Sequence, residues 1–355
     1  LAFIEDRRKL MVMNMENKKV RQITDGKLWH STAGYFDYSW SPDGKWFTLC
    51  FIGNKHDPYS DIGIVSAQGG EITNLTNSGY TSGSPRWVMD GNAILFTSER
   101  YGMRNHASWG SMEDVFLCFV NQDAYDKFRL SEEDYELLKE LEKEQEKLKK
   151  EAEKKGKKDD KKEDKKDDKD DKEKDEVKAI NIELEGIQDR IVRLTPTSSR
   201  LGDAIIDKKG ETLYYLASFE GAMDLWKIKL REMDVTLASK GAGYGTFEID
   251  EEGKNIFLLG SRMKKMDPAS GKLTSISYNA QMKMDLVAER EAMFNHVYKQ
   301  QQKRFYNVNM HGVDWDAMTA AYRKFLPHIN NNYDYAELLS EWLGELNVSH
   351  TGGRY

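Results

Sequence analysis

The stretch SWSPDGKWFTLCF (39–51) places two apolar runs on either side of a polar turn that contains Gly44. This arrangement is typical of a β-hairpin, because glycine readily adopts the positive φ that tight turns demand. It recurs three times, as RWVMDGNAILFTS (86–98), AIIDKKGETLYYLAS (204–218) and FEIDEEGKNIFLLGS (247–261). The turn glycines Gly44, Gly91, Gly210 and Gly253 are separated by 47, 119 and 43 residues.

A second pair of short apolar runs follows each hairpin, often with a Leu-Thr-like step at its end. These pairs are DIGIVSAQGGEITNLT (61–76), QDRIVRLT (188–195), DLWKIKLREMDVTLA (224–238) and MKKMDPASGKLTSI (263–276). Four short strands in a period of about 45 residues are typical of a β-propeller blade. The sequence therefore predicts a mainly β fold over residues 1–280. Residues 1–25 are the closing strands of one blade, and four further blades follow.

The longest spacing between turn glycines contains a highly charged segment. Residues 131–178 hold 17 Lys and 21 Asp or Glu, whereas the other 307 residues carry a net charge of −3. The segment begins with a helical pattern in which Ser131 and Asp134 form an N-terminal cap. Beyond Gly156 it has almost no apolar residue and is expected to be disordered. We interpret it as a solvated insertion between two strands of one blade, with a tether or docking tail as the alternative.

The hydrophobic period changes from 2 to 3.6 after about residue 281, which predicts a small helical domain over residues 281–355. A first helix has a mostly apolar stripe of Val287, Glu291, Phe294, Tyr298, Gln301 and Phe305. A second begins at the cap Asp314, presents Trp315, Met318, Tyr322 and Phe325, and ends at Pro327. A third, with a capping box of Asp334 and Glu337, buries Leu338, Leu339, Trp342, Leu343 and Leu346.

Composition excludes several classes of function. The near-neutral body offers no basic surplus to neutralise phosphates, which argues against nucleic acid as the main partner. No run of 18 apolar residues is present, so no membrane span is expected. Cys50 and Cys118 lie within apolar runs and are expected to be buried free thiols. No metal or cofactor motif is found, and the glycine-rich string GAGYG (241–245) is interpreted as a turn.

One histidine stands apart from the other six. Ser349 and His350 follow the third helix in a short polar loop. A loop histidine held by a rigid helix suits a general base, because its pKa near 6.5 allows proton transfer at neutral pH. Of the others, His311 in the NMHGVDW connection is a better candidate for lining a cleft than the remaining five. The rest are interpreted as surface, rim or packing residues: His30, His56, His106, His296 and His328.

The chain also resembles the tricorn protease family, which comprises large serine peptidases related to tail-specific, C-terminal-processing proteases. The SPDGKW-type repeats are shared with TolB-like and prolyl-oligopeptidase-like propellers. Three C-terminal stretches are more specific: EREAMFNHVYKQQQKRFY (289–306), NMHGVDWDAM (309–318) and LSEWLGELNVSHTGG (339–353). The resemblance implies that His350 is the catalytic general base and that Ser349 orients it. It also implies peptide substrates, a propeller that guides them, and a homo-oligomer.

In that family the nucleophilic serine, a glutamate and the oxyanion-hole amides lie in a later α/β domain, beyond a PDZ-like module. We therefore expect this chain to be a truncated piece that is inactive alone. The alternative is a non-catalytic, TolB-like propeller module that binds peptides or protein partners. A propeller attached to an α/β-hydrolase peptidase is disfavoured, because no Gly-x-Ser-x-Gly elbow is present. The resemblance implies a cytoplasmic protein; because the chain begins at Leu1, an exported or periplasmic one is also considered.

Overall fold

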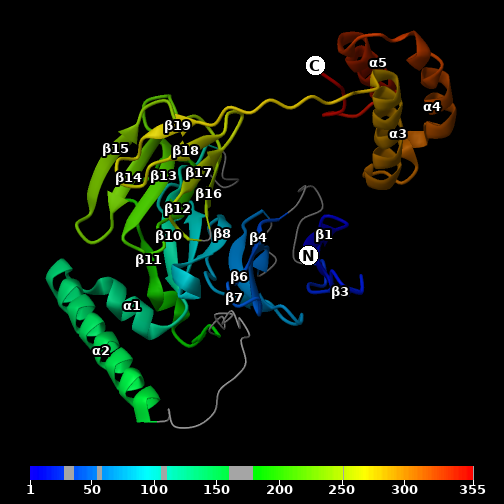
Figure 1. The fold of residues 1–355 in the computed structure, drawn as a ribbon. Helices are drawn as coiled ribbons and strands as arrows, with labels where there is room; N and C mark the ends of the chain where they lie inside the picture. Colours follow the sequence, from blue (N-terminus) through cyan, green and yellow to red (C-terminus); the bar gives the residue numbers. More distant parts are fainter. Residues whose placement is uncertain (28–35, 54–57, 105–109, 160–178, 251, 355) are drawn as a thin grey trace, which may run out of the picture. The chain divides into compact units, whose positions relative to one another are not determined.

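The computed structural model of this chain describes residues 1–27, 36–53, 58–104, 110–159, 179–250 and 252–354 (Figure 1). The chain divides into two compact units, Leu1–Ser277 and Tyr278–Tyr355. His30, His56 and His106, together with the tract 160–178 predicted to be disordered, lie outside the described residues.

The described part of the first unit consists mainly of five antiparallel sheets, which supports the prediction of successive propeller blades. The first has three strands: β1 (Ala2–Glu5), β2 (Lys9–Met13) and β3 (Val20–Gln22). The second contains β4 (Tyr38–Trp40), β5 (Trp46–Phe51), β6 (Asp61–Ser66) and β7 (Thr73–Asn74). The third contains β8 (Ser82–Val88), β9 (Ala93–Ser98), β10 (Asp114–Phe119) and β11 (Ile191–Arg193). The fourth contains β12 (Arg200–Ile206), β13 (Thr212–Ser218), β14 (Asp224–Lys229) and β15 (Asp234–Ser239). The fifth contains β16 (Thr246–Ile249), β17 (Ile256–Leu259), β18 (Lys264–Met266) and β19 (Leu273–Ser275).

The four predicted hairpins are present. They are the pairs β4–β5, β8–β9, β12–β13 and β16–β17. All four turn glycines have positive φ, with values of 66° at Gly44, 88° at Gly91, 72° at Gly210 and 71° at Gly253. GAGYG (241–245) lies in the connection between β15 and β16 and begins no helix, as predicted.

The alternation of side chains between the two faces of each strand explains why the sheets stack. In β9, Ile94 and Phe96 join a core shared with the second sheet, whereas Ala93 and Leu95 join a core shared with the fourth. In β13, Leu213 and Tyr215 face the core shared with the third sheet, and alternate residues face the core shared with the fifth. Since successive side chains of a strand point to opposite faces, each inner blade is buried on both sides. Cys118 is a buried free thiol in one of these cores, and burial raises its pKa to about 12.

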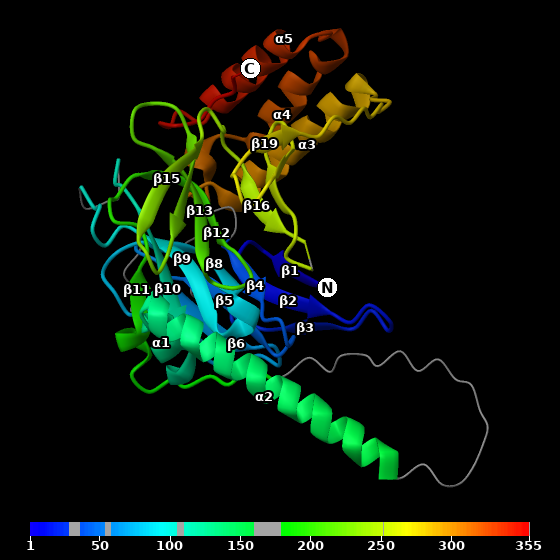
Figure 2. The ribbon, with the colours of Figure 1, turned by 60° about the vertical axis from the view of Figure 1, so that its left-hand side comes forward.

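The charged insertion lies between β10 and β11, two paired strands of one blade. It begins with α1 (Gln122–Arg129), which the hydrophobic pattern did not reveal, followed by α2 (Glu132–Asp159). The predicted cap is present, because Ser131 Oγ accepts a hydrogen bond from the Asp134 amide at 3.1 Å. Helix α2 continues through Gly156, so the predicted end of the helix was too early. Figure 2 shows α2 projecting away from the sheets.

The base of α2 is attached to the fourth sheet. Tyr135 is buried, and the Arg231 guanidinium lies 3.5 Å from its ring centroid. Arg231 also donates hydrogen bonds to the carbonyl oxygens of Lys127, Phe128 and Leu130. An arginine on one blade thus stabilises the end of α1 and the start of α2, which belong to the preceding blade.

The second unit contains three α-helices: α3 (Leu286–Arg304), α4 (Trp315–Arg323) and α5 (Asn332–Gly344). Two 3₁₀ turns connect them, η4 (Met310–Gly312) and η5 (Leu326–His328). Asp314 caps α4 as predicted, because its side chain accepts from the Ala317 amide at 2.9 Å. The side chain of Asn331 caps α5, so the predicted capping box at Asp334 was placed three residues too late.

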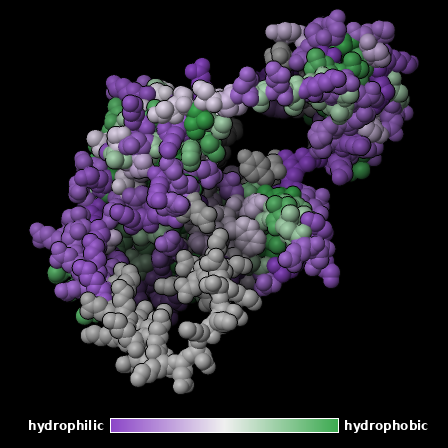
Figure 3. Space-filling model, viewed as in Figure 1, coloured by the Kyte–Doolittle hydropathy of each residue, from purple (hydrophilic) through white to green (hydrophobic). Residues whose placement is uncertain are grey.

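Two residues predicted to lie on the apolar faces of these helices are exposed. Val287 is 70% exposed because it lies in the first turn of α3, ahead of the buried contacts at Arg290 and Phe294. Phe325 is 58% exposed because α4 ends at Arg323, which removes it from the helical face. No described helix is both long and apolar enough to cross a membrane. The visible surface is largely hydrophilic (Figure 3).

Candidate active site

The helical unit is organised around Trp342 of α5, which is fully buried. Its ring stacks on Trp315 of α4 at a centroid distance of 4.7 Å and on Phe294 of α3 at 4.1 Å. Leu338, Leu343 and Leu346 join the same core, and Leu339 packs against it, as predicted for this face. Because one aromatic stack joins all three helices, the end of α5 is fixed relative to the rest of the unit.

The chain leaves α5 through a series of tight turns. The amides of Leu346 and Asn347 donate to the carbonyl oxygens of Leu343 and Gly344 at 3.2 and 2.9 Å. Asn347 then adopts a φ of 45°, which reverses the chain, and Val348 packs against the core. The loop therefore begins at a buried leucine and presents the next residues at a defined point.

Ser349 and His350, the predicted site residues, lie in contact with each other and are both exposed. Ser349 Oγ is 2.6 Å from His350 Nδ1. Adjacent side chains usually diverge, whereas these two lie in contact. His350 has a φ of 65°, in the left-handed region, and this local conformation accompanies the contact between the two side chains.

This geometry suits a general base. When His350 Nδ1 carries the proton and donates it to Ser349 Oγ, the Nε2 lone pair is available to accept a proton. The same hydroxyl oxygen stabilises the imidazolium that forms. Among the described residues, no second hydrogen-bond partner of the His350 ring is found, and the residue is exposed.

His311 is engaged in the structure. It lies in η4 with a φ of 57°, and its Nδ1 is 2.9 Å from the carbonyl oxygen of Leu346. Its Nε2 lies 2.5 Å from the Tyr306 hydroxyl. Both ring nitrogens therefore have partners, and His311 holds the end of α5. His296 and His328 are exposed.

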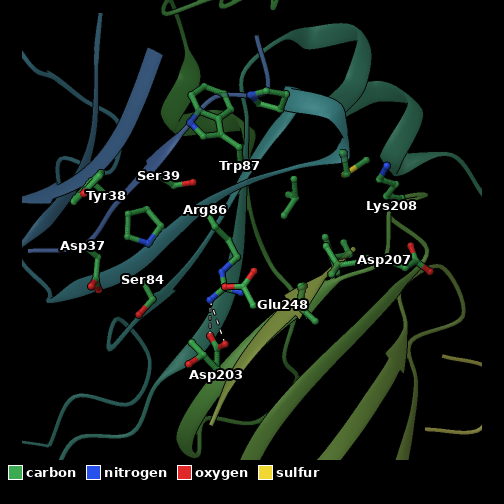
Figure 4. Close-up of a pocket in the computed structure, with 18 of the residues that line it drawn as sticks. Asp37, Tyr38, Ser39, Ser84, Arg86, Trp87, Asp203, Asp207, Lys208 and Glu248 are labelled. Carbon is green, nitrogen blue, oxygen red and sulfur yellow. Dashed lines mark hydrogen bonds and ion pairs between the residues drawn. The ribbon is translucent and has the colours of Figure 1, made fainter. Parts of the chain in front are cut away.

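A separate cavity of about 660 Å³ lies in the first unit (Figure 4). It is lined by residues on or beside β4, β8, β12 and β16, the first strand of each of the four blades. Five carboxylates and two cations are among its lining side chains, so negatively charged groups outnumber positively charged ones. The volume lies within the range of ligand pockets, about 300–1,000 Å³.

Arg86 connects three blades at this cavity. Its guanidinium donates to Asp203 Oδ1 at 2.9 Å and to the carbonyl oxygen of Phe247 at 3.2 Å. The amide of Phe247 in turn donates to Asp203 Oδ2 at 2.6 Å. These residues lie on β8, β12 and β16, and Figure 4 shows Arg86 pointing toward Asp203. The sequence analysis did not identify these residues. The available signal was that each lies five to seven residues before the turn glycine of its hairpin.

Both units were compared with known proteins and protein families. Residues 286–344 match the tricorn protease C1 domain family. The putative tricorn protease homolog 2 of Streptomyces coelicolor is 23% identical in an alignment of 335 residues that covers 88% of this chain. By these matches the chain is similar to tricorn-like proteins. The tricorn protease homolog 1 of the same organism is 25% identical in an alignment of 191 residues that covers 48% of this chain.

The fold agrees with this relationship. A crystal structure of the tricorn protease aligns with 99% of the chain at a TM-score of 0.61 and 12% identity. The chain spans 27% of the length of homolog 2, 18% of homolog 1 and 32% of the crystallised protein. An uncharacterized peptidase of Bacillus subtilis, YuxL, is 41% identical over 68 residues, and the chain covers 10% of it.

The tricorn-like C1 match ends at Gly344, five residues before Ser349. It therefore includes α3, α4 and α5, the helices that support the loop, but not the loop itself. Within the described residues, no group of three or more His, Cys, Asp or Glu side chains could hold a metal ion.

Proposed function

We propose that the protein of which this tricorn-like chain is a part hydrolyses peptide bonds as a serine peptidase. His350 is the general base for a nucleophilic serine that lies outside these residues, and Ser349 fixes the orientation of its ring. The observation that supports this proposal is the 2.6 Å contact between Ser349 Oγ and His350 Nδ1 on an exposed loop. The propeller blades guide peptide substrates, and the full-length protein forms a homo-oligomer, as the family resemblance implies.

The test is His350→Ala in the full-length protein, with His296→Ala as the matched control because it is another exposed histidine of the same unit. His350→Ala should lower peptidase kcat/KM by at least about a thousandfold, since triad members act as a unit. Its free energy of unfolding should stay within about 1 kcal/mol of wild type, because the side chain is exposed. His296→Ala should change neither quantity.

Two results would contradict this role. Retained turnover in His350→Ala would show that His350 is an ordinary surface histidine without a catalytic role. Labelling of the present chain alone by a serine-directed fluorophosphonate, above all at Ser349, would show that the nucleophile had been wrongly placed outside it.

A second candidate function is a non-catalytic module that binds peptides or protein partners. The observation that favours it is the 660 Å³ cavity at the first strands of four blades. Binding of peptides to the full-length protein without any turnover would favour this alternative over hydrolysis.

A further inference from the structure

The loop that carries His350 returns to the helix it came from. The hydroxyl of Ser340, on α5, accepts a hydrogen bond from the Gly353 amide at 2.9 Å. The same hydroxyl donates to the Gly353 carbonyl oxygen at 2.8 Å. A single half-buried side chain therefore satisfies both backbone groups of one residue and joins the chain beyond His350 to α5.

Close packing at this point favours a glycine. A Cβ on Gly353 would lie 3.0 Å from the Ala336 carbonyl oxygen and 3.0 Å from the Leu339 Cβ. Both neighbours belong to α5 and are held there by the helix, so a larger residue would push the loop away. Gly344, at the end of the same helix, is different: a Cβ there would meet nothing within 4 Å.

The other end of the loop is fixed as well. Leu346 is fully buried, and its carbonyl oxygen is 2.9 Å from His311 Nδ1. Within the loop, Thr351 Oγ1 donates to the Val348 carbonyl oxygen at 3.1 Å. Ser349 and His350 are thus the exposed part of a segment that is attached to the helical unit before and after them.

The backbone of His350 explains why two attachments are needed. A non-glycine residue with a φ of 65° is strained, and such a conformation persists only where the surrounding structure over-determines it. Freed at Gly353, the chain could relax at His350 to negative φ. The ring would then move away from Ser349, since the contact between these neighbours is formed in the left-handed conformation.

We propose that Ser340 is a positioning residue for His350. By holding Gly353 against α5 it keeps His350 in the left-handed conformation and its Nδ1 against Ser349. His311 performs the complementary task at Leu346. We call these two attachments, at Gly353 and at Leu346, the clamp. Its functional meaning rests on the proposed role of His350 as general base, but the clamp itself can be tested without measuring activity.

The experiment uses the chain with ¹⁵N-labelled backbone and histidine rings. Ser340→Ala should lower the order parameter of the His350 amide from about 0.85 to below 0.6. It should also shift the His350 ring nitrogens toward the values of Ser349→Ala, in which the contact is absent. Ser340→Thr, which keeps the hydroxyl, should retain the wild-type ring signals. A merely structural serine would affect thermal stability but not the ring nitrogens of a residue ten positions away.

Gly353→Ala tests the same clamp without removing the hydroxyl, with Gly344→Ala as its matched control. Gly353→Ala should reproduce the loss of order at His350, and Gly344→Ala should not. If Ser340→Ala fails to fold, Gly353→Ala and Gly344→Ala still test the proposal. Wild-type order and ring signals in folded Ser340→Ala, or in Gly353→Ala, would overturn the proposal.

The full-length enzyme separates this proposal from the proposed function. Ser340→Ala should lower kcat about 10- to 100-fold with little change in KM, because a displaced base affects the chemical step rather than substrate binding. If the ring signals move as expected while His350→Ala keeps full turnover, the clamp is real and the proposed function is wrong. If kcat and ring signals of Ser340→Ala both stay at wild-type values, the clamp is wrong and the role of His350 is unaffected.

Discussion

At the scale of single residues, Glu113 shows how burial controls a charge inside a blade. Burial raises the pKa of its carboxyl group, and the neighbouring Glu99 and Asp114 carboxylates raise it further. A hydrogen bond from Thr97 Oγ1 to Glu113 Oε1, 3.1 Å long, acts in the opposite direction. The folded protein therefore binds the Glu113 proton more tightly than the unfolded chain does.

The consequence is a stability that depends on pH. The contribution of Glu113 to the free energy of unfolding falls as pH rises from its ordinary pKa of 4.5 through the raised value. Glu113→Gln removes this titration and keeps an acceptor for Thr97. We expect the variant to be more stable than wild type at pH 7.5, by on the order of 1 kcal/mol, with a smaller difference at pH 5.5. Urea unfolding at both pH values measures this.

The control is Glu220→Gln, which changes an exposed glutamate. Because this side chain is exposed, the free energy of unfolding of the variant should stay within about 0.5 kcal/mol of wild type. If the free energy of unfolding of Glu113→Gln fell relative to that of wild type as pH rises, the Glu113 carboxylate would be stabilised in the folded state, and the prediction would be wrong.

At the scale of the elements, a repeated aspartate–threonine pair closes the blades. Asp61 and Asp114 each begin the third strand of their sheet and are buried. Thr76 and Thr195, from the Leu-Thr steps after the fourth strands, donate to them at 2.7 and 2.8 Å. Each threonine hydroxyl also accepts a hydrogen bond from the amide next to its aspartate, at 3.1 Å. The first sheet shows the amide half of this pattern at Thr24. The Leu-Thr steps of the sequence are thus the points where the outer strand is joined to the third.

Asp114→Ala should therefore be strongly destabilising. Asp114 is fully buried and accepts from Thr195, from Ser198 at 2.7 Å and from Arg193 at 2.8 Å. Removing one partner of a buried ion pair leaves the other uncompensated, which costs about 3 kcal/mol or more. The free energy of unfolding measured in urea reports the loss.

Asp234→Ala is the matched control, because Asp234 also begins a strand but is exposed. We expect it to stay within about 0.5 kcal/mol of wild type. Equal effects of the two substitutions would show that the buried network contributes nothing specific.

At the scale of the whole molecule, two units are joined by an exposed connection. Residues 277–284 contain neither helix nor strand, and all are exposed. The propeller unit has cores shared between neighbouring sheets, whereas the helical unit has its own aromatic core around Trp342. Each unit therefore has the packing it needs for stability, and the connection carries little of it.

Limited proteolysis under native conditions tests this division. Trypsin should cut after Lys283 and release a resistant fragment that begins at Met284, because an exposed segment without regular structure fits a protease site. Lys299 is also exposed but lies within α3, so it should be cut much more slowly. Mass spectrometry identifies the fragments, and Lys283→Gln should remove the first cut. Early cleavage inside α3 would contradict an independently stable helical unit.

Much of this molecule could be predicted because its signals are local. The alternation and turn glycines indicated all four hairpins, since a strand's register and a turn's φ depend on residues a few positions apart. The buried face of α5 followed from its helical period for the same reason. Boundaries were less secure: Asn331 rather than Asp334 caps α5, and Phe325 lies beyond the end of α4. Caps depend on one hydrogen bond, which several neighbouring side chains can make.

For the candidate site, the residue types alone indicate the available chemistry, a hydroxyl and an imidazole at Ser349 and His350 after an apolar helix. Their geometry depends on the packing of the folded unit. The left-handed φ of His350 is compatible with many sequences, and it is held here by Ser340 and His311, ten and 39 positions away. Arg86 and Asp203, 117 positions apart, meet only because the blades stack. A local pattern reports contacts between near neighbours, whereas these positions are set by the packing of whole elements against one another.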